Sequence, residues 1–317
     1  MPTVTREQLE NSLAALANEI RDPSEGILGP RSVAWKLGGD LAVFLGGGRA
    51  ALLQLAHPMV AYAVDHHSKT RSDVVGRFQR TFRNVFAMVF GDLDDAFTAA
   101  RRVHSVHTRI YGEIPHAVGA YRAHAPYHAN DPDALRWVYA TLVDTTIAVR
   151  ERLDGALPTA LKDAYIVEMN RFAALFGIPR DLLAHTWTAH EMYMRRMLSS
   201  DEIAVAPVAR EMAMFLVGRG GIAPQPPLGR VAEAITATML PTRLVHEFGL
   251  RASPVSSAAV RVALATSAPI YRRLPDSAVA IPARSLAARR LVGQPPSQLS
   301  AWMERQLFGL TRQVTGT

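Results

Sequence analysis

Apolar residues recur at the spacing of an α-helix along most of this chain, and this periodicity limits the fold more than any other feature of the sequence. It predicts helices at about 5–21, 49–56, 73–90, 93–111, 132–153, 158–176, 179–199, 204–218, 228–239, 254–272, 282–292 and 296–311. We find no convincing alternation of apolar and polar residues of the kind that marks a strand. The sequence therefore predicts an all-α fold.

A run with the composition of a hinge or surface linker, RGGIAPQPPL, lies at 219–228. The helices predicted after it are apolar enough to pack against the first part of the chain. With 317 residues, the chain is long enough to bury a substantial core. We expect one domain over 1–317, with its core at about 30–250 and the C-terminal helices at 254–311 packed against that core.

The chain has no cysteine, which excludes disulfides, thiolate zinc sites, iron–sulfur clusters and thiolate-ligated haem. The formal net charge is +7, but the arginines that supply most of it are scattered and form no basic block. We therefore expect no nucleic-acid partner. The charge indicates either an ordinary basic surface or recognition of anionic groups such as propionates or phosphates.

The first 20 residues are typical of a polar amphipathic helix that opens at Thr5, without the apolar segment of a signal peptide. The most apolar region, 42–64, is interrupted by three glycines and by polar residues that include Arg49 and His57. A membrane-spanning helix needs about 20 apolar residues with few such interruptions. We therefore expect a cytoplasmic protein with no integral membrane span.

Two histidines and a tyrosine are spaced to share one face of the helix predicted at 93–111. His104 and His107 are three residues apart, and Tyr111 follows four residues later. An imidazole on such a face can bind a metal or a haem iron, and His107 is the strongest candidate. Zinc or non-haem iron needs further ligands, and Glu113 is the only carboxylate nearby. The alternative is a pair of core or surface histidines.

The helix predicted at 73–90 carries a polar stripe formed by Arg77, Arg80 and Thr81 among apolar residues such as Phe78 and Phe82. The arginines are either a clamp for a carboxylate such as a haem propionate, donors to bound dioxygen, or simply arginines with buried stems. Arginine stays protonated and cannot ligate iron. Thr81 either bonds to its own helix backbone or lines the distal side of a pocket.

Three other features draw attention. His57 follows the end of a helix, where it either caps the helix or lines a pocket. Asp144 is a lone carboxylate in a strongly apolar helix and needs a partner, which we expect to be an arginine or histidine of the site. The loop at 112–131 is long, and long loops in compact domains are often functional. Motifs of hydrolases, kinases and nucleotide-binding proteins are absent from the sequence.

Four ordered stretches resemble a family that contains the latex-clearing rubber oxygenases and the MpaB-type oxygenase of fungal mycophenolic acid biosynthesis. They are GGGRAALLQLAHP at 46–58, GRFQRT at 76–81, RRVHSVH at 101–107 and LRWVYATLVDT at 135–145, and the similarity extends over about 30–250, including LPTRL at 240–244. The resemblance implies a globin-like helical core around b-type haem, with His107 as the proximal ligand. Rubber oxygenases have a lysine where this chain has Arg80, so the resemblance implies an open, water-filled or hydrogen-bonded distal position here.

We therefore expect a haem-dependent oxygenase that uses dioxygen, or peroxide, on an apolar unsaturated molecule such as an isoprenoid or lipid, adding oxygen across a C=C bond and in some cases cleaving it. His107 would bind the iron, Arg77 and Arg80 would anchor propionates or polarise dioxygen, and Thr81 and His104 would act beside the iron. Phe78 would seat the porphyrin or substrate, and His57 is a further candidate for the haem pocket. The alternative is a non-catalytic carrier or sensor of haem or an apolar ligand. We expect a monomer or homodimer.

Overall fold

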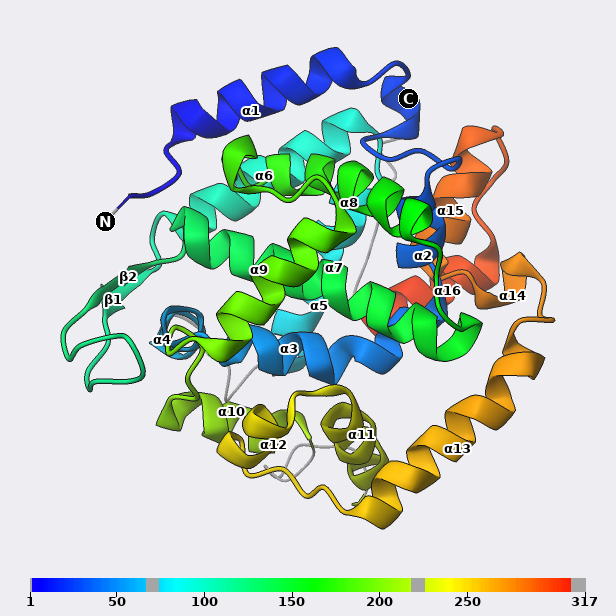
Figure 1. Cartoon of the computed structure of the whole chain (residues 1–317). Helices are drawn as coiled ribbons and strands as arrows, with labels where there is room; N and C mark the ends of the chain where they lie inside the picture. Colours follow the sequence, from blue (N-terminus) through cyan, green and yellow to red (C-terminus); the bar gives the residue numbers. More distant parts are fainter. Residues whose placement is uncertain (1, 67–73, 218–225, 309–317) are drawn as a thin grey trace.

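The computed structural model describes residues 2–66, 74–217 and 226–308. Within these ranges the chain forms sixteen α-helices and one short two-stranded sheet, so the prediction of an all-α fold is confirmed (Figure 1). The first half contains α1 (Arg6–Glu19), α2 (Val33–Gly38), α3 (Gly47–Leu55), α4 (Pro58–His66), α5 (Val74–Phe90), α6 (Leu93–His107), β1 (Tyr111–Glu113), β2 (Pro126–His128) and α7 (Pro132–Asp154). The predicted start at Thr5 is confirmed, because its side chain caps α1 by accepting from the Gln8 backbone.

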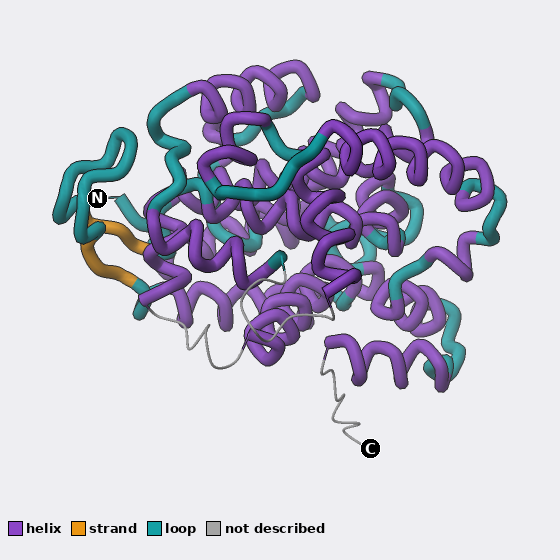
Figure 2. The backbone as a smooth tube through the Cα atoms, turned by 90° about the horizontal axis from the view of Figure 1, so that it is seen from below, coloured by secondary structure: helices purple, strands orange, loops and turns teal. Residues whose placement is uncertain are grey.

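The second half continues with α8 (Thr159–Ala174), α9 (Trp187–Ser199), α10 (Pro207–Leu216), α11 (Pro226–Met239), α12 (Thr242–Glu247), α13 (Pro254–Tyr271), α14 (Asp276–Val279), α15 (Pro282–Leu291) and α16 (Gln298–Phe308). Three short 3₁₀ helices lie at Pro23–Glu25, Leu41–Gly46 and Arg180–Leu182. Figure 2 shows from a second direction that helices make up most of the described chain. None of the described helices is long and apolar enough to cross a membrane.

The long helix α7 lies at the centre of the molecule, and different faces of it enter three hydrophobic clusters. Trp137 packs with α3, α9 and α10 to α12, while Val143 packs with α1, α6 and α8. Val149 packs near the other end of α7 with residues of α11 and α13. A helix with apolar residues on most of its circumference is expected to be buried, and α7 fits this description. The C-terminal helix α13 thus packs against α7, while the single-domain prediction stays a prediction.

The three glycines at 46–48 allow close helix packing. A Cβ atom on Gly46 would lie 2.4 Å from Thr145 Cγ2 of α7, and one on Gly48 would lie 2.1 Å from Thr236 Oγ1 of α11. Gly47 begins α3 with nothing within 4 Å of its Cβ position. The outer two glycines therefore let α3 approach α7 and α11 closely, and this brings Arg49 into the core.

Two predicted helix boundaries are wrong. The helix predicted at 93–111 ends at His107, and the C-cap residue Thr108 donates its hydroxyl to the carbonyl oxygens of His104 and Ser105. Tyr111 pairs with His128 in the antiparallel sheet, so it does not share a helix face with His107. The helix predicted at 179–199 is also divided, because Thr186 caps a new helix, α9, by accepting from the Ala189 backbone.

Candidate functional site

The residues predicted to act beside a cofactor lie on two antiparallel helices, α5 and α6, joined by a short turn at 91–92. Arg102 Nη1 donates to Asn84 Oδ1 at 3.3 Å and links the two helices. Arg80 lies one turn before Asn84, and His107 lies just over one turn after Arg102. Because the helices are antiparallel, Arg80 and His107 both lie at the end of the pair that contains the start of α5 and the end of α6.

The exposure of these side chains differs. His107 is partly buried as the last residue of α6, whereas Arg80 and Thr81 are exposed on α5. Arg77 and Phe78 belong to α5, but their side chains lie outside the described residues. The donors present are thus one imidazole and a guanidinium on neighbouring helices. By their chemistry they fit a haem, which needs an axial nitrogen ligand and carries anionic propionates.

After Thr81, α5 carries a row of aromatic side chains that extends to the end of the helix. Phe82 contacts Phe86 with ring centroids 5.4 Å apart, and Phe86 contacts Phe90 at 6.2 Å. Phe82 also contacts Phe44, at 5.7 Å. Phe78 precedes Phe82 by one helical turn. The aromatic row therefore lies on the face of α5 opposite the exposed Arg80, where it packs with Trp35 and Ile281 in the protein core.

His104 is buried and its ring bonds to the N-terminal segment. Its Nε2 lies 2.9 Å from the carbonyl oxygen of Val4. A carbonyl can only accept, so Nε2 carries the proton and donates. The backbone oxygen of His104 also accepts from Asn130 Nδ2 at 3.4 Å. His104 therefore joins α6 to both the N-terminus and the start of α7, and its predicted catalytic role stays a prediction.

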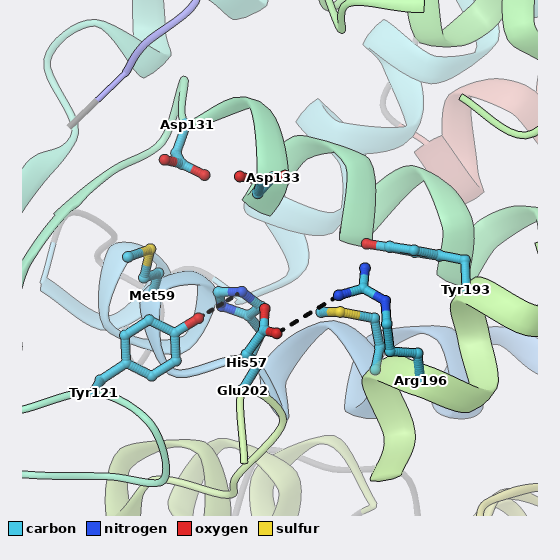
Figure 3. Close-up of a pocket in the computed structure, with 9 residues that line it drawn as sticks. His57, Met59, Tyr121, Asp131, Asp133, Tyr193, Arg196 and Glu202 are labelled. Atoms are coloured by element: carbon cyan, nitrogen blue, oxygen red, sulfur yellow. Dashed lines mark hydrogen bonds and ion pairs between the residues drawn. The ribbon is translucent and has the colours of Figure 1, made fainter. Parts of the chain in front are cut away.

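His57 lines a second site, a cavity of about 260 Å³ between α4, the loop before β2, the start of α7 and the end of α9 (Figure 3). Its Nε2 lies 3.1 Å from the Tyr121 hydroxyl, while Nδ1 has no hydrogen-bond partner among the described residues. Burial lowers the pKa of His57 to about 4, so the ring is neutral at pH 7. The cavity is lined by His57, Met59, Tyr121, Asp131, Asp133, Tyr193, Arg196, Met197 and Glu202.

The cavity is mainly acidic. Asp131, Asp133 and Glu202 face it together with Arg196, which lies 3.9 Å from Glu202. Burial raises the pKa of the Asp131 carboxyl, whose Oδ1 also caps α7 by accepting from the Ala134 backbone. Tyr193 lies near two guanidinium groups, and burial raises its pKa to about 12. A haem carries two propionates, which the three carboxylates of this cavity would repel.

A buried ionic cluster lies between α3, α7 and α9. Arg49 donates through Nη2 to Asp144 at 2.6 Å, through Nη1 to Thr145 at 2.7 Å and through Nε to the Met239 carbonyl at 2.9 Å. His190 Nε2 lies 3.7 Å from the other Asp144 oxygen. Burial opposes ionisation of Asp144, but the nearby His190 ring and the charge of Arg49 hold its pKa below the usual value. The prediction that Asp144 needs an arginine or histidine partner is thus confirmed.

Sequence reasoning did not identify the residues that share the cavity with His57. Tyr121 belongs to the 112–131 loop, for which we expect a function, but Tyr193, Arg196 and Glu202 belong to no motif. They come from distant segments and meet only through the packing of α9 against the α7 region. Among the described residues, no group of three or more histidine and carboxylate side chains is placed to hold a metal ion.

The chain was compared with known families and structures. A family model described as the catalytic domain of ER-bound oxygenase mpaB/B′ and rubber oxygenase matches residues 35–272. No curated protein and no solved structure matches the chain. The matched range begins in α2 and ends just after α13, so it includes the α5–α6 pair, the cavity and the buried ionic cluster.

Proposed function

Because the chain belongs to the family of mpaB/B′ and rubber oxygenase catalytic domains, we propose that it is a haem b-dependent oxygenase acting on an apolar, unsaturated small molecule. The family supports an oxygenase in general, with a small-molecule substrate and dioxygen. The haem, the residues that hold it and the substrate class are the parts that we add. The haem proposal rests on the side chains at the end of the α5–α6 pair, and the substrate class rests on the family.

The observation that carries the haem proposal is the position of His107. It ends α6, is partly buried, and lies at the same end of the helix pair as Arg80. A neutral imidazole is a strong axial ligand for haem iron. When bound, haem b would supply an iron centre that activates dioxygen.

The arginines of α5 perform two tasks in this proposal. Arg77 and Arg80 would bind propionates or donate hydrogen bonds to dioxygen, and both tasks need a fixed positive charge. Arginine cannot ligate iron, so Arg80 would not itself occupy a coordination site of the iron. Thr81 adds a hydroxyl on the same turn of α5.

The substrate class in this proposal rests on the family, whose description names rubber, an apolar unsaturated polymer. An isoprenoid or unsaturated lipid is a small molecule of the same chemical kind. The reaction we propose is oxygen addition at a C=C bond. If the bond is cleaved, one dioxygen and one C=C bond give two carbonyl groups, so the net reaction balances without an external electron donor.

The experiment is a measurement of oxygen uptake by the purified protein, supplied with hemin, in the presence of unsaturated isoprenoids and fatty acids. We expect uptake with at least one alkene and, with ¹⁸O₂, label in the product. The saturated analogue of the active alkene is the control and should give no uptake. A protein that binds haem but oxidises none of these alkenes, with either dioxygen or peroxide, is the carrier or sensor of the alternative hypothesis.

A further inference from the structure

The helix α13 exposes an apolar stripe on the side opposite its packed face. Ala268 is buried, and Leu264 and Tyr271 pack with it against residues of α7 and α11. On the other side Val255 is 78% exposed, Val262 62% and Ile270 66%. Intervals of seven and eight residues place these three within about a quarter of the helix circumference. In Figure 1, α13 runs along one outer edge of the molecule.

The positive charge of the protein is concentrated in the same part of the chain. Residues 251–317 contain nine of the 35 basic residues, all arginine, and two of the 28 acidic residues. Their net charge is therefore +7, and the first 250 residues are balanced. The arginines are scattered along the whole chain, as the sequence analysis noted, but the acidic residues are not.

Two of these arginines lie on one flank of α13, between the apolar stripe and the packed face. Arg261 and Arg272 are exposed and eleven residues apart, or about three turns, so both lie on the same flank of α13. Arg273 is also exposed directly after the helix. In the described part of this region, the carboxylate ion pairs involve Arg284 and Arg290 and leave the α13 arginines facing solvent. Exposed apolar residues flanked by arginine are the pattern of a helix that lies in a membrane interface.

We propose that α13 binds the surface of a membrane that contains anionic lipids. Val255, Val262 and Ile270 enter the boundary between headgroups and acyl chains, and Arg261 and Arg272 bind lipid phosphates. Charge favours this occupant over a second copy of the chain, because a symmetric dimer would place the same arginine-flanked stripe opposite itself. The inference does not depend on haem. It goes beyond the proposed oxygenase activity, because it places the protein on the lipid bilayer, in which apolar substrates dissolve.

The test is co-sedimentation of the full chain with vesicles of phosphatidylcholine, with and without about one third phosphatidylserine. We expect binding to the anionic vesicles, weaker binding at high salt, and little binding to phosphatidylcholine alone. The triple variant Val255→Gln, Val262→Gln and Ile270→Gln should reduce binding at least tenfold. Each of Arg261→Gln and Arg272→Gln should reduce it about fivefold.

The matched controls change the same kinds of residue elsewhere. Val167→Gln with Met192→Gln removes exposed apolar side chains from α8 and α9. Arg122→Gln and Arg195→Gln, each made singly, remove one exposed arginine as Arg261→Gln and Arg272→Gln do. These controls should bind vesicles as the unaltered chain does. Absence of binding to anionic vesicles, or equal loss in the controls, would overturn the proposal. A dimer in light scattering that the triple variant converts to monomer, without vesicle binding, would assign the stripe to a second copy instead.

Discussion

Arg49 on α3 and Asp144 on α7 form an ion pair in the protein core, with Nη2 2.6 Å from Oδ2 and both side chains less than one fifth exposed. Arg49 also donates to the Thr145 hydroxyl and to the Met239 carbonyl, so each of its three nitrogens makes a hydrogen bond. The pair therefore ties α3, α7 and α11 together at one point. Two of the stretches by which the chain resembles its family meet here.

Removing one member of this pair should destabilise the protein strongly. Arg49→Met leaves a buried carboxylate without its cation, and we expect a loss of about 3–5 kcal/mol in the free energy of unfolding. The control Arg6→Met breaks an exposed pair with Glu10 and should cost at most about 1 kcal/mol. Urea denaturation compares the two. Equal losses would show that the buried pair contributes no more than a surface one.

The same pair should make stability fall in acid. Because the folded-state pKa of Asp144 is below its ordinary value, the unfolded chain binds a proton more readily. Its contribution to stability is therefore present above the ordinary aspartate pKa and is lost as the pH falls through the folded value. Asp144→Asn should abolish this part of the acid dependence, measured as the free energy of unfolding against pH. An unchanged acid dependence in the variant would contradict this assignment.

His57 should add a second pH dependence in a different range. Its folded-state pKa of about 4 lies below the ordinary 6.5, so protonation favours the unfolded chain, and stability falls as the pH drops from 6.5 toward 4. Between about pH 7 and pH 5 we expect the unaltered protein to lose about 2 kcal/mol through this group. His57→Gln should lack that loss, as urea denaturation at both pH values would show. The same slope in both proteins would mean that His57 is accessible to protons when folded.

The glycines of α3 offer a test of helix packing. Gly46→Ala places a Cβ 2.4 Å from Thr145 Cγ2 and 2.8 Å from Val149 Cγ2, so the helices must separate. We expect a loss of about 1–3 kcal/mol in thermal or urea unfolding. Gly47→Ala is the control, since nothing lies within 4 Å of its Cβ position, and it should be neutral or slightly stabilising. Similar effects of the two changes would refute the packing role.

Much of the fold could be predicted from the sequence, because the spacing of the apolar residues indicates which face of each helix is buried. The need of Asp144 for a partner was also predictable, since an isolated buried carboxylate is too costly. The partner Arg49 was not, because it lies 95 residues away and only the approach permitted by Gly46 and Gly48 brings it into contact. The end of α6 at His107 was missed because no glycine or proline directly follows it in the sequence.

The candidate site was predictable only in part. His107 and Arg80 occupy neighbouring helices because each helix has its own sequence pattern and a short turn joins them. The cavity at His57 collects Tyr121, Tyr193 and Glu202 from segments that no spacing rule connects. The cavity is acidic because the packing of α9 beside the start of α7 brings Glu202 close to Asp131 and Asp133.

The central claim is that His107 binds haem, and an absorption spectrum tests it most directly. The protein from haem-supplemented cells is measured in the ferric form and then reduced, with and without carbon monoxide, beside His107→Ala and a control, His185→Ala, which changes an exposed histidine. We predict a Soret band that shifts with carbon monoxide, is kept in the control and is lost or greatly reduced in His107→Ala. No Soret band in the unaltered protein, even with added hemin, or an unchanged spectrum in His107→Ala, would contradict the account.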